Sequence, residues 1–274
     1  MEIIYQKYLH SSVIAADKKQ LIADCSLTGT DYDAIGRLTT DYYSYSIDDA
    51  WWEICRSPAN EFNGAGRAPE LKGVEAYLGA GGALRKAVGA VAGGIPLVLL
   101  SECVKVVLQA ETYMFADRGY PTSDAYELYW EEMYANACRY YSHLDRVNRH
   151  WLAEEADHYH NKSLFSRFLD CRVCRLSNGG RIVSGGFSDS VHELSVHMEL
   201  DNSGAISVCS GNYLRAPDPV CRESITHIAG LTGKRPAELG KREVGGLLGG
   251  GQGCNHLVDL VYNMCETVIT SENR

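Results

Sequence analysis

The side chains best suited to chemistry lie in residues 249–263, GGGQGCNHLVDLVYN. Cys254 follows several glycines and precedes an apolar pattern at helical spacing. The pattern predicts that Cys254 lies at the first turn of a helix, where the partial positive charge of the N-terminus favours a thiolate. His256 follows closely, and Asp259 is placed to contact it one turn further on. Together with His192, these residues predict nucleophilic or acid–base catalysis.

Metal binding is a second interpretation of the same residues. Cys221, Cys254, His256 and His192 form a set with the ligand types and number that zinc prefers. The set is scattered along the sequence and lacks the compact spacing of small zinc modules. Structural roles for both cysteines, as small buried side chains, therefore stay open. We expect no cofactor, and zinc if a metal is bound.

A rival group of candidate ligands lies outside this segment. His150, Glu154 and His158 are spaced four residues apart, so one helix face would present all three. Two imidazoles and a carboxylate on one face offer metal ligands or a base. A solvated polar helix face is the alternative interpretation.

Aromatic side chains dominate the segment just before this group. Pro121 and the capping-box spacing of Asp124 and Glu127 predict the start of a helix. The aromatic residues recur at three- and four-residue steps, and predict one face of a single long helix: Tyr126, Tyr129, Trp130, Tyr134 and Tyr141. Such a face either packs on the rest of the chain or lines a pocket for an aromatic substrate, and both can hold.

An internal repeat organises the elements that position these side chains. Residues 32–58 align without gaps with residues 191–217, which places Ile35 on Leu194. Residues 99–114 align in the same order with residues 254–269. Two matches in one order indicate duplication.

Each copy begins with strand-like alternation and ends in helical patterns. This order predicts an α+β fold of two tandem repeats, each a small antiparallel sheet followed by helices. We assign residues 1–117 to the first copy, 118–162 to a helical connector and 163–274 to the second copy.

The first copy carries none of the candidate ligands. Leu99 stands where the second copy has Cys254, Ser101 where it has His256, and Asp33 where it has His192. The joint absence predicts one asymmetric site per chain, in the second copy.

The motifs of the second copy resemble a bacterial family of unknown function. They are His192-Glu193-Leu194, Pro217 followed by Cys221, and Gly253-Cys254-Asn255-His256-Leu257. The resemblance covers residues 163–270, and more faintly residues 8–115. Members of that family often accompany genes for the breakdown of lignin-like aromatic acids, which implies a small aromatic substrate.

Composition excludes several classes of partner. The 274-residue chain has a net charge of −9, which argues against nucleic acids and anionic membranes. The start lacks a signal-peptide pattern, and the apolar run at 95–100 is shorter than the roughly 20 residues of a membrane span. We expect a cytoplasmic protein, with a homo-oligomer left open.

These observations predict a small-molecule enzyme. No dinucleotide or phosphate-loop motif is present in the sequence, so we expect a lyase or hydrolase that uses general acid–base chemistry in a tyrosine-lined cleft. The alternative is a non-catalytic ligand-binding or assembly protein whose Cys/His corner is structural.

Overall fold

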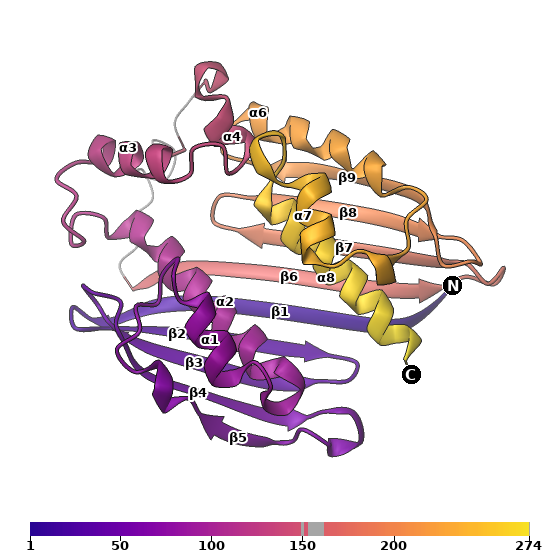
Figure 1. Ribbon diagram of the computed structural model, residues 1–274, viewed down its shortest axis with the longest axis horizontal. Helices are drawn as coiled ribbons and strands as arrows, with labels where there is room; N and C mark the ends of the chain where they lie inside the picture. The colour runs from indigo at the N-terminus through magenta and orange to yellow at the C-terminus, as the bar shows by residue number, and fades with distance from the viewer. Residues whose placement is uncertain (149–150, 153–161, 274) are drawn as a thin grey trace. The chain divides into compact units, whose positions relative to one another are not determined.

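The computed structural model describes residues 1–148, 151–152 and 162–273, which form an α+β fold (Figure 1). The chain divides into two compact units. The amino-terminal unit contains residues 8–123 and the described part of 158–168. The carboxy-terminal unit contains residues 1–7, the described part of 124–157, and residues 169–274. Strands β1 and β6 therefore contribute residues to both units.

The amino-terminal unit is built on antiparallel strands in the order β5-β4-β3-β2-β1. The strands are β1 (Glu2–Asp17), β2 (Gln20–Gly29), β3 (Asp33–Asp41), β4 (Ile47–Arg56) and β5 (Gly64–Arg67). The helices are α1 (Gly81–Val88) and α2 (Ile95–Ala110), with 3-10 turns at Pro58–Asn60, Pro69–Leu71, Val91–Gly94 and Glu111–Tyr113. Helix α2 packs on β2 and β3. A Cβ on Gly36 would lie 2.8 Å from the Cβ of Leu99, so glycine permits this close approach.

One helical run, Val91–Tyr113, is long and apolar enough to cross a membrane, and it is the only such run among the described residues. The sequence alone did not predict this run, because its longest contiguous apolar stretch is short. Half of its most apolar window is buried inside the fold, and α2 packs on the sheet. We therefore interpret it as a core helix.

The carboxy-terminal unit also contains four strands followed by helices, and α3 (Ser123–Met133) and α4 (Arg139–Ser142) precede these strands in the chain. Its strands, in the order β6-β7-β8-β9, are β6 (Ser163–Arg175), β7 (Arg181–Asp189), β8 (Glu193–Leu200) and β9 (Ile206–Arg215). The helices after the strands are α6 (Pro219–Arg222), α7 (Lys241–Leu248) and α8 (Asn255–Glu272). Its 3-10 turns are Leu144–Arg146, Glu223–Leu231, Pro236–Glu238 and Gly250–Gln252. Helix α8 crosses the face of β7 (Figure 1).

The aromatic segment does not form the single long helix that its spacing predicts. Helix α3 ends at Met133, and Asn136 adopts a left-handed backbone with φ of 62°. Helix α4 begins only at Arg139. A left-handed residue cannot continue an α-helix, so Tyr134 and Tyr141 lie beyond the end of the helix that carries Tyr126.

The strand registers correct the ungapped alignment of the two halves. Strands β4 and β9 correspond at the predicted offset, but Leu194 occupies the register position of Ala34, not Ile35. The reason lies between the last paired residues of each hairpin: the pair of Thr40 and Ile47 encloses one residue more than the pair of Leu200 and Ile206. A one-residue slip reverses the faces of a strand. Accordingly, Ile35 is 37% exposed, whereas Leu194 is 2% exposed.

Candidate active site

The turn between β7 and β8 positions the first two side chains of the site. The Asp189 N–H donates to the His192 carbonyl at 2.9 Å. The Asp189 carboxylate accepts the N–H groups of Val191 at 2.8 Å and His192 at 2.5 Å. From β9, the Arg215 guanidinium donates to the Asp189 carbonyl at 2.6 Å. The turn is therefore held by its own hydrogen bonds and by one from Arg215 on β9.

The glycine-rich segment before α8 positions His256. Cys254 is the N-cap of α8, and its N–H donates to the Leu248 carbonyl at 2.8 Å. A Cβ on Gly253 would lie 1.9 Å from that same carbonyl oxygen, so no other residue fits there without movement. The first turn of α8 thus carries His256 to the β7–β8 turn.

Asp189, His192 and His256 converge into one cluster. Their candidate ligand atoms all lie within 4.8 Å of one another. The His192 Nδ1 is 3.3 Å from Asp189 Oδ1, and the His256 Nε2 is 3.6 Å from Asp189 Oδ2. The two imidazole centroids are 3.9 Å apart, with planes tilted by 32°. The Asp189 side chain is 3% exposed, and the two imidazoles are 15% and 20% exposed.

The cluster keeps Asp189 ionised in spite of its burial. Burial by itself raises the pKa of this carboxyl, because it disfavours the charged form. The charge and hydrogen bond of His192 outweigh that effect, and His256 adds to it. The pKa of Asp189 therefore ends well below its usual range. The site holds a buried anion between two imidazoles.

Cys254 lies on the other side of His256. Its Sγ is 3.9 Å from the His256 Nδ1, whereas Asp189 faces Nε2. Burial raises the pKa of the Cys254 thiol, and its contact with the Tyr213 hydroxyl only partly offsets this. We expected the helix N-terminus to lower the pKa of this thiol. The direction is wrong, because desolvation outweighs the helix dipole here.

Cys221 lies near Cys254 but outside the cluster of Asp189 and the two histidines. It is buried on α6 and packs against Tyr140 and Val220. Burial raises the pKa of the Cys221 thiol to about 12. The Tyr213 hydroxyl contacts Cys254 and lies 2.9 Å from Ser224 Oγ. Ser224 Oγ in turn donates to the Cys221 carbonyl at 2.7 Å. Among the described residues, neither cysteine belongs to the three-residue group with metal-ligand spacing.

Residues 166–270 match the family described as "Protein of unknown function (DUF2889)". This agrees with the resemblance to a family of unknown function. The DUF2889 segment includes the whole cluster, Cys221 and Cys254. No curated protein and no solved structure matches the chain.

The carboxylate beside both imidazoles is one that the sequence analysis missed. Asp189 belongs to the DUF2889 segment and precedes His192 by three residues, a spacing typical of a side chain that accepts backbone N–H groups in a turn. Asp259, the carboxylate that the sequence analysis favoured, forms an ion pair with Lys241 at 3.1 Å.

The predicted aromatic residues form a connected cluster in the carboxy-terminal unit. Ring centroids are 4.8 Å apart between Trp130 and Tyr134, and 5.6 Å apart between Tyr134 and Tyr141. Tyr126 lies 6.1 Å from Trp130, and Tyr129 lies 5.8 Å from it. Tyr126 and Trp130 are buried, while the other three aromatic residues are half-buried.

Backbone contacts join this aromatic segment to the DUF2889 segment. The N–H of Arg139 donates to the carbonyl of Gly253 at 2.8 Å, directly before Cys254. A Cβ on Gly251 would lie 2.8 Å from Ser142 Oγ. Gly253 thus allows the tight turn before α8, and Gly251 allows α4 to pack closely against this segment.

The rival group of His150, Glu154 and His158 lies outside the described residues.

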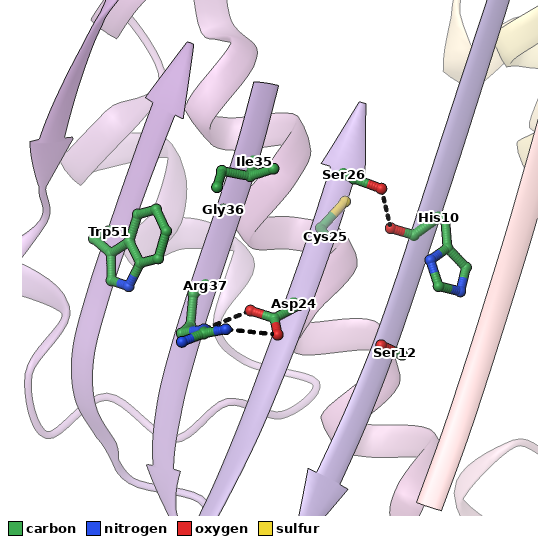
Figure 2. A pocket seen from close by; sticks show the side chains of 9 residues that line it. All are labelled: His10, Ser12, Asp24, Cys25, Ser26, Ile35, Gly36, Arg37 and Trp51. Atoms are coloured by element: carbon green, nitrogen blue, oxygen red, sulfur yellow. Dashed lines mark hydrogen bonds and ion pairs between the residues drawn. The ribbon is translucent and has the colours of Figure 1, made fainter. Parts of the chain in front are cut away.

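A separate hollow of about 250 Å³ lies in the amino-terminal unit, on strands β1 to β4 (Figure 2). Arg37 donates to both carboxylate oxygens of Asp24, at 2.5 and 2.9 Å, and lies 5.7 Å from the Trp51 ring. The Arg37–Asp24 ion pair is exposed, and the two charges neutralise each other. The hollow therefore offers a polar and aromatic surface, and it does not contain the Asp–His–His cluster.

Proposed function

We propose that this protein is an enzyme that acts on a small molecule by non-redox acid–base chemistry, as a lyase or a hydrolase. The observation that supports the proposal is the cluster of Asp189, His192 and His256, with a buried carboxylate between two partly exposed imidazoles. Such a cluster is suited to activating a water molecule or a substrate hydroxyl.

The chemistry follows from the charge of Asp189. A buried carboxylate stabilises positive charge on the imidazole side of the cluster. Removing a proton from water leaves that positive charge behind, so Asp189 favours the activated state. The backbone N–H groups of Val191 and His192 hold the carboxylate in place. Because its support is rigid, the cluster needs little reorganisation during the reaction.

The proposed substrate is an aromatic, lignin-like acid or alcohol. This part rests on the family resemblance and on the aromatic cluster, in which Tyr134 and Tyr141 are half-buried. Tyrosine walls give an aromatic ring apolar contact and a hydroxyl partner. The proposal includes a cytoplasmic location, and no nucleic-acid or membrane partner.

The test is a turnover screen of wild-type protein against lignin-derived aromatic acids, esters and alcohols. His256→Gln should lower kcat/KM by about 100-fold or more, as expected for a lost acid–base group. His197→Gln is the matched control, because this histidine lies on β8 of the same unit, pairs with Glu199 and does not belong to the Asp–His–His cluster. If both variants keep wild-type turnover, the cluster does not take part in catalysis.

A non-catalytic ligand-binding or assembly protein is the second candidate function. The observation that favours it is the corner of Cys254, Cys221 and Tyr213, which is buried and has raised thiol pKa values. In that case, an aromatic acid raises the melting temperature of wild type and His256→Gln alike, and neither protein converts it.

A further inference from the structure

We propose that Asp189, His192 and His256 bind one divalent transition-metal ion, with zinc as the representative. The inference rests on the proposed function and refines it, because a bound ion would take the place of an imidazole in activating the water. Metal binding is measured without any substrate. It rests on the spacing of the three side chains, on their chemical types and on their supporting contacts.

The imidazole–carboxylate contacts are longer than charge-assisted hydrogen bonds usually are, and their spacing admits one ion. Charge-assisted N–H···O contacts are normally about 2.7–2.9 Å long. The two imidazole–carboxylate distances here are 3.3 and 3.6 Å. Two ligand atoms about 2.1 Å from a tetrahedral ion lie about 3.4 Å apart. The distance from His256 Nε2 to Asp189 Oδ2 is close to that value, and the candidate ligand atoms of all three side chains lie within 4.8 Å of one another.

The chemical types select the kind of ion. Two imidazoles favour zinc and its transition-metal neighbours over magnesium and calcium, which take oxygen ligands. Two histidines and one carboxylate form an established ligand set for catalytic zinc, with the fourth position left to water. A water in that position has a pKa near 7, which meets the requirement of the proposed function.

The neighbours of the cluster provide the outer support that metal ligands need. A histidine ligand usually donates its second ring N–H to an acceptor, which fixes the tautomer. The His256 Nδ1 faces the Cys254 sulfur at 3.9 Å, which leaves Nε2 on the side of Asp189. The backbone N–H groups of Val191 and His192 both donate to Asp189 Oδ1, which leaves Oδ2, the oxygen that faces His256, for the ion. Cys254 is thus a positioning residue and not a ligand.

The test measures zinc directly. Protein stripped with a chelator is reloaded with Zn²⁺, desalted and analysed by elemental mass spectrometry. Wild type and His197→Gln should retain about one ion per chain. His192→Gln and His256→Gln should bind at least 100-fold more weakly in competition with a chromophoric chelator. Circular dichroism of the stripped proteins checks that each variant is folded.

Cobalt spectroscopy of wild type keeps the test decisive if the variants fail to fold. Co²⁺-loaded protein should show the ligand-field bands of a nitrogen- and oxygen-ligated site, and no thiolate-to-cobalt charge transfer. A charge-transfer band would overturn the assignment in favour of a cysteine ligand. Wild type without stoichiometric zinc would overturn it, as would loss of zinc in His158→Gln, a variant of the rival group outside the described residues.

The two proposals fail separately. Turnover by the stripped, metal-free protein would overturn the metal site and leave the proposed function standing. A zinc-loaded protein that converts no aromatic acid, ester or alcohol would support the metal site and count against the proposed function.

Discussion

At the scale of single residues, the sequence pointed to Cys254 as the reactive group, whereas the structure favours His256. The helix N-terminus drew attention to the thiol, yet burial raises its pKa and leaves it a neutral neighbour of His256. The imidazole, in contrast, reaches Asp189 with its other nitrogen. We therefore propose that His256 carries the chemistry and that the thiol helps to orient it.

Substitution of Cys254 tests this division of roles. Cys254→Ser keeps an acceptor near the His256 Nδ1, whereas Cys254→Ala removes it. Loss of an outer-sphere partner typically costs about 10–100-fold in metal affinity. We expect a loss of that size in Cys254→Ala and a smaller loss in Cys254→Ser, measured by competition with a chromophoric chelator. Complete loss of zinc from both variants would make Cys254 a ligand.

At the scale of elements, the glycine-rich segment before α8 determines where His256 lies. A Cβ on Gly253 would meet the Leu248 carbonyl, so Gly253→Ala must displace the start of α8. Overpacking of this kind typically costs about 1–3 kcal/mol of unfolding free energy. We expect a lower melting temperature and weaker zinc binding, measured by thermal unfolding and chelator competition.

Gly246→Ala is the matched control for that prediction. Gly246 lies inside α7, and a Cβ there would meet no atom within 4 Å. Alanine is a better helix former than glycine, so this variant should gain about 0.5–1 kcal/mol and keep its zinc affinity. If both variants behaved alike, the segment would not be the element that positions His256.

The connector around α4 carries a pH-dependent contact with the rest of its unit. Arg146 and Arg139 both donate to the Glu223 carboxylate, and their hydrogen bonds lower the pKa of that carboxyl from 4.5. A carboxyl with a lowered folded-state pKa contributes stability above its unfolded pKa, and this is lost as pH falls through the folded value. The wild-type melting temperature should therefore fall more steeply below about pH 4.5 than that of Glu223→Gln.

The exposure of Glu223 limits the size of this effect, since exposed ion pairs are screened. Glu272→Gln, which removes the exposed partner of Arg181 on another part of the unit, serves as the control. Thermal unfolding between pH 3 and pH 6 measures all three proteins. Parallel curves for wild type and Glu223→Gln would show that the contact does not couple to folding.

The elements show what could be read from the sequence and what could not. Alternation and turn residues predicted strands before helices, and the glycines with Cys254 predicted the start of α8. The break at Asn136 was missed, because aromatic spacing continues across it. Asp189 was missed because its role depends on a turn that places it beside His256, far away in the sequence. Local patterns do not report such convergence.

At the scale of the whole molecule, each unit has a turn with the same backbone and arginine hydrogen bonds but with different side chains. Gly29 donates its N–H to the Tyr32 carbonyl, as Asp189 does to His192. Arg56 donates to the carbonyls of Gly29 and Tyr32, at 2.7 and 3.2 Å. The register therefore replaces Asp33 with Tyr32 as the counterpart of His192. The amino-terminal unit keeps the braced turn without the carboxylate and the imidazole, so of these two turns only the one in the carboxy-terminal unit carries the cluster.

The matching arginines allow this asymmetry to be tested in one protein. Arg215→Ala removes the hydrogen bond to the Asp189 carbonyl, and Arg56→Ala removes the equivalent hydrogen bonds in the amino-terminal unit. Each variant should lose about 1 kcal/mol of unfolding free energy, because each frees one turn. Only Arg215→Ala should weaken zinc binding, by about 10-fold, because only its turn holds ligands. Equal loss of affinity in both variants would contradict a single site, whereas titration of Arg56→Ala to one ion per chain would place that site in the carboxy-terminal unit.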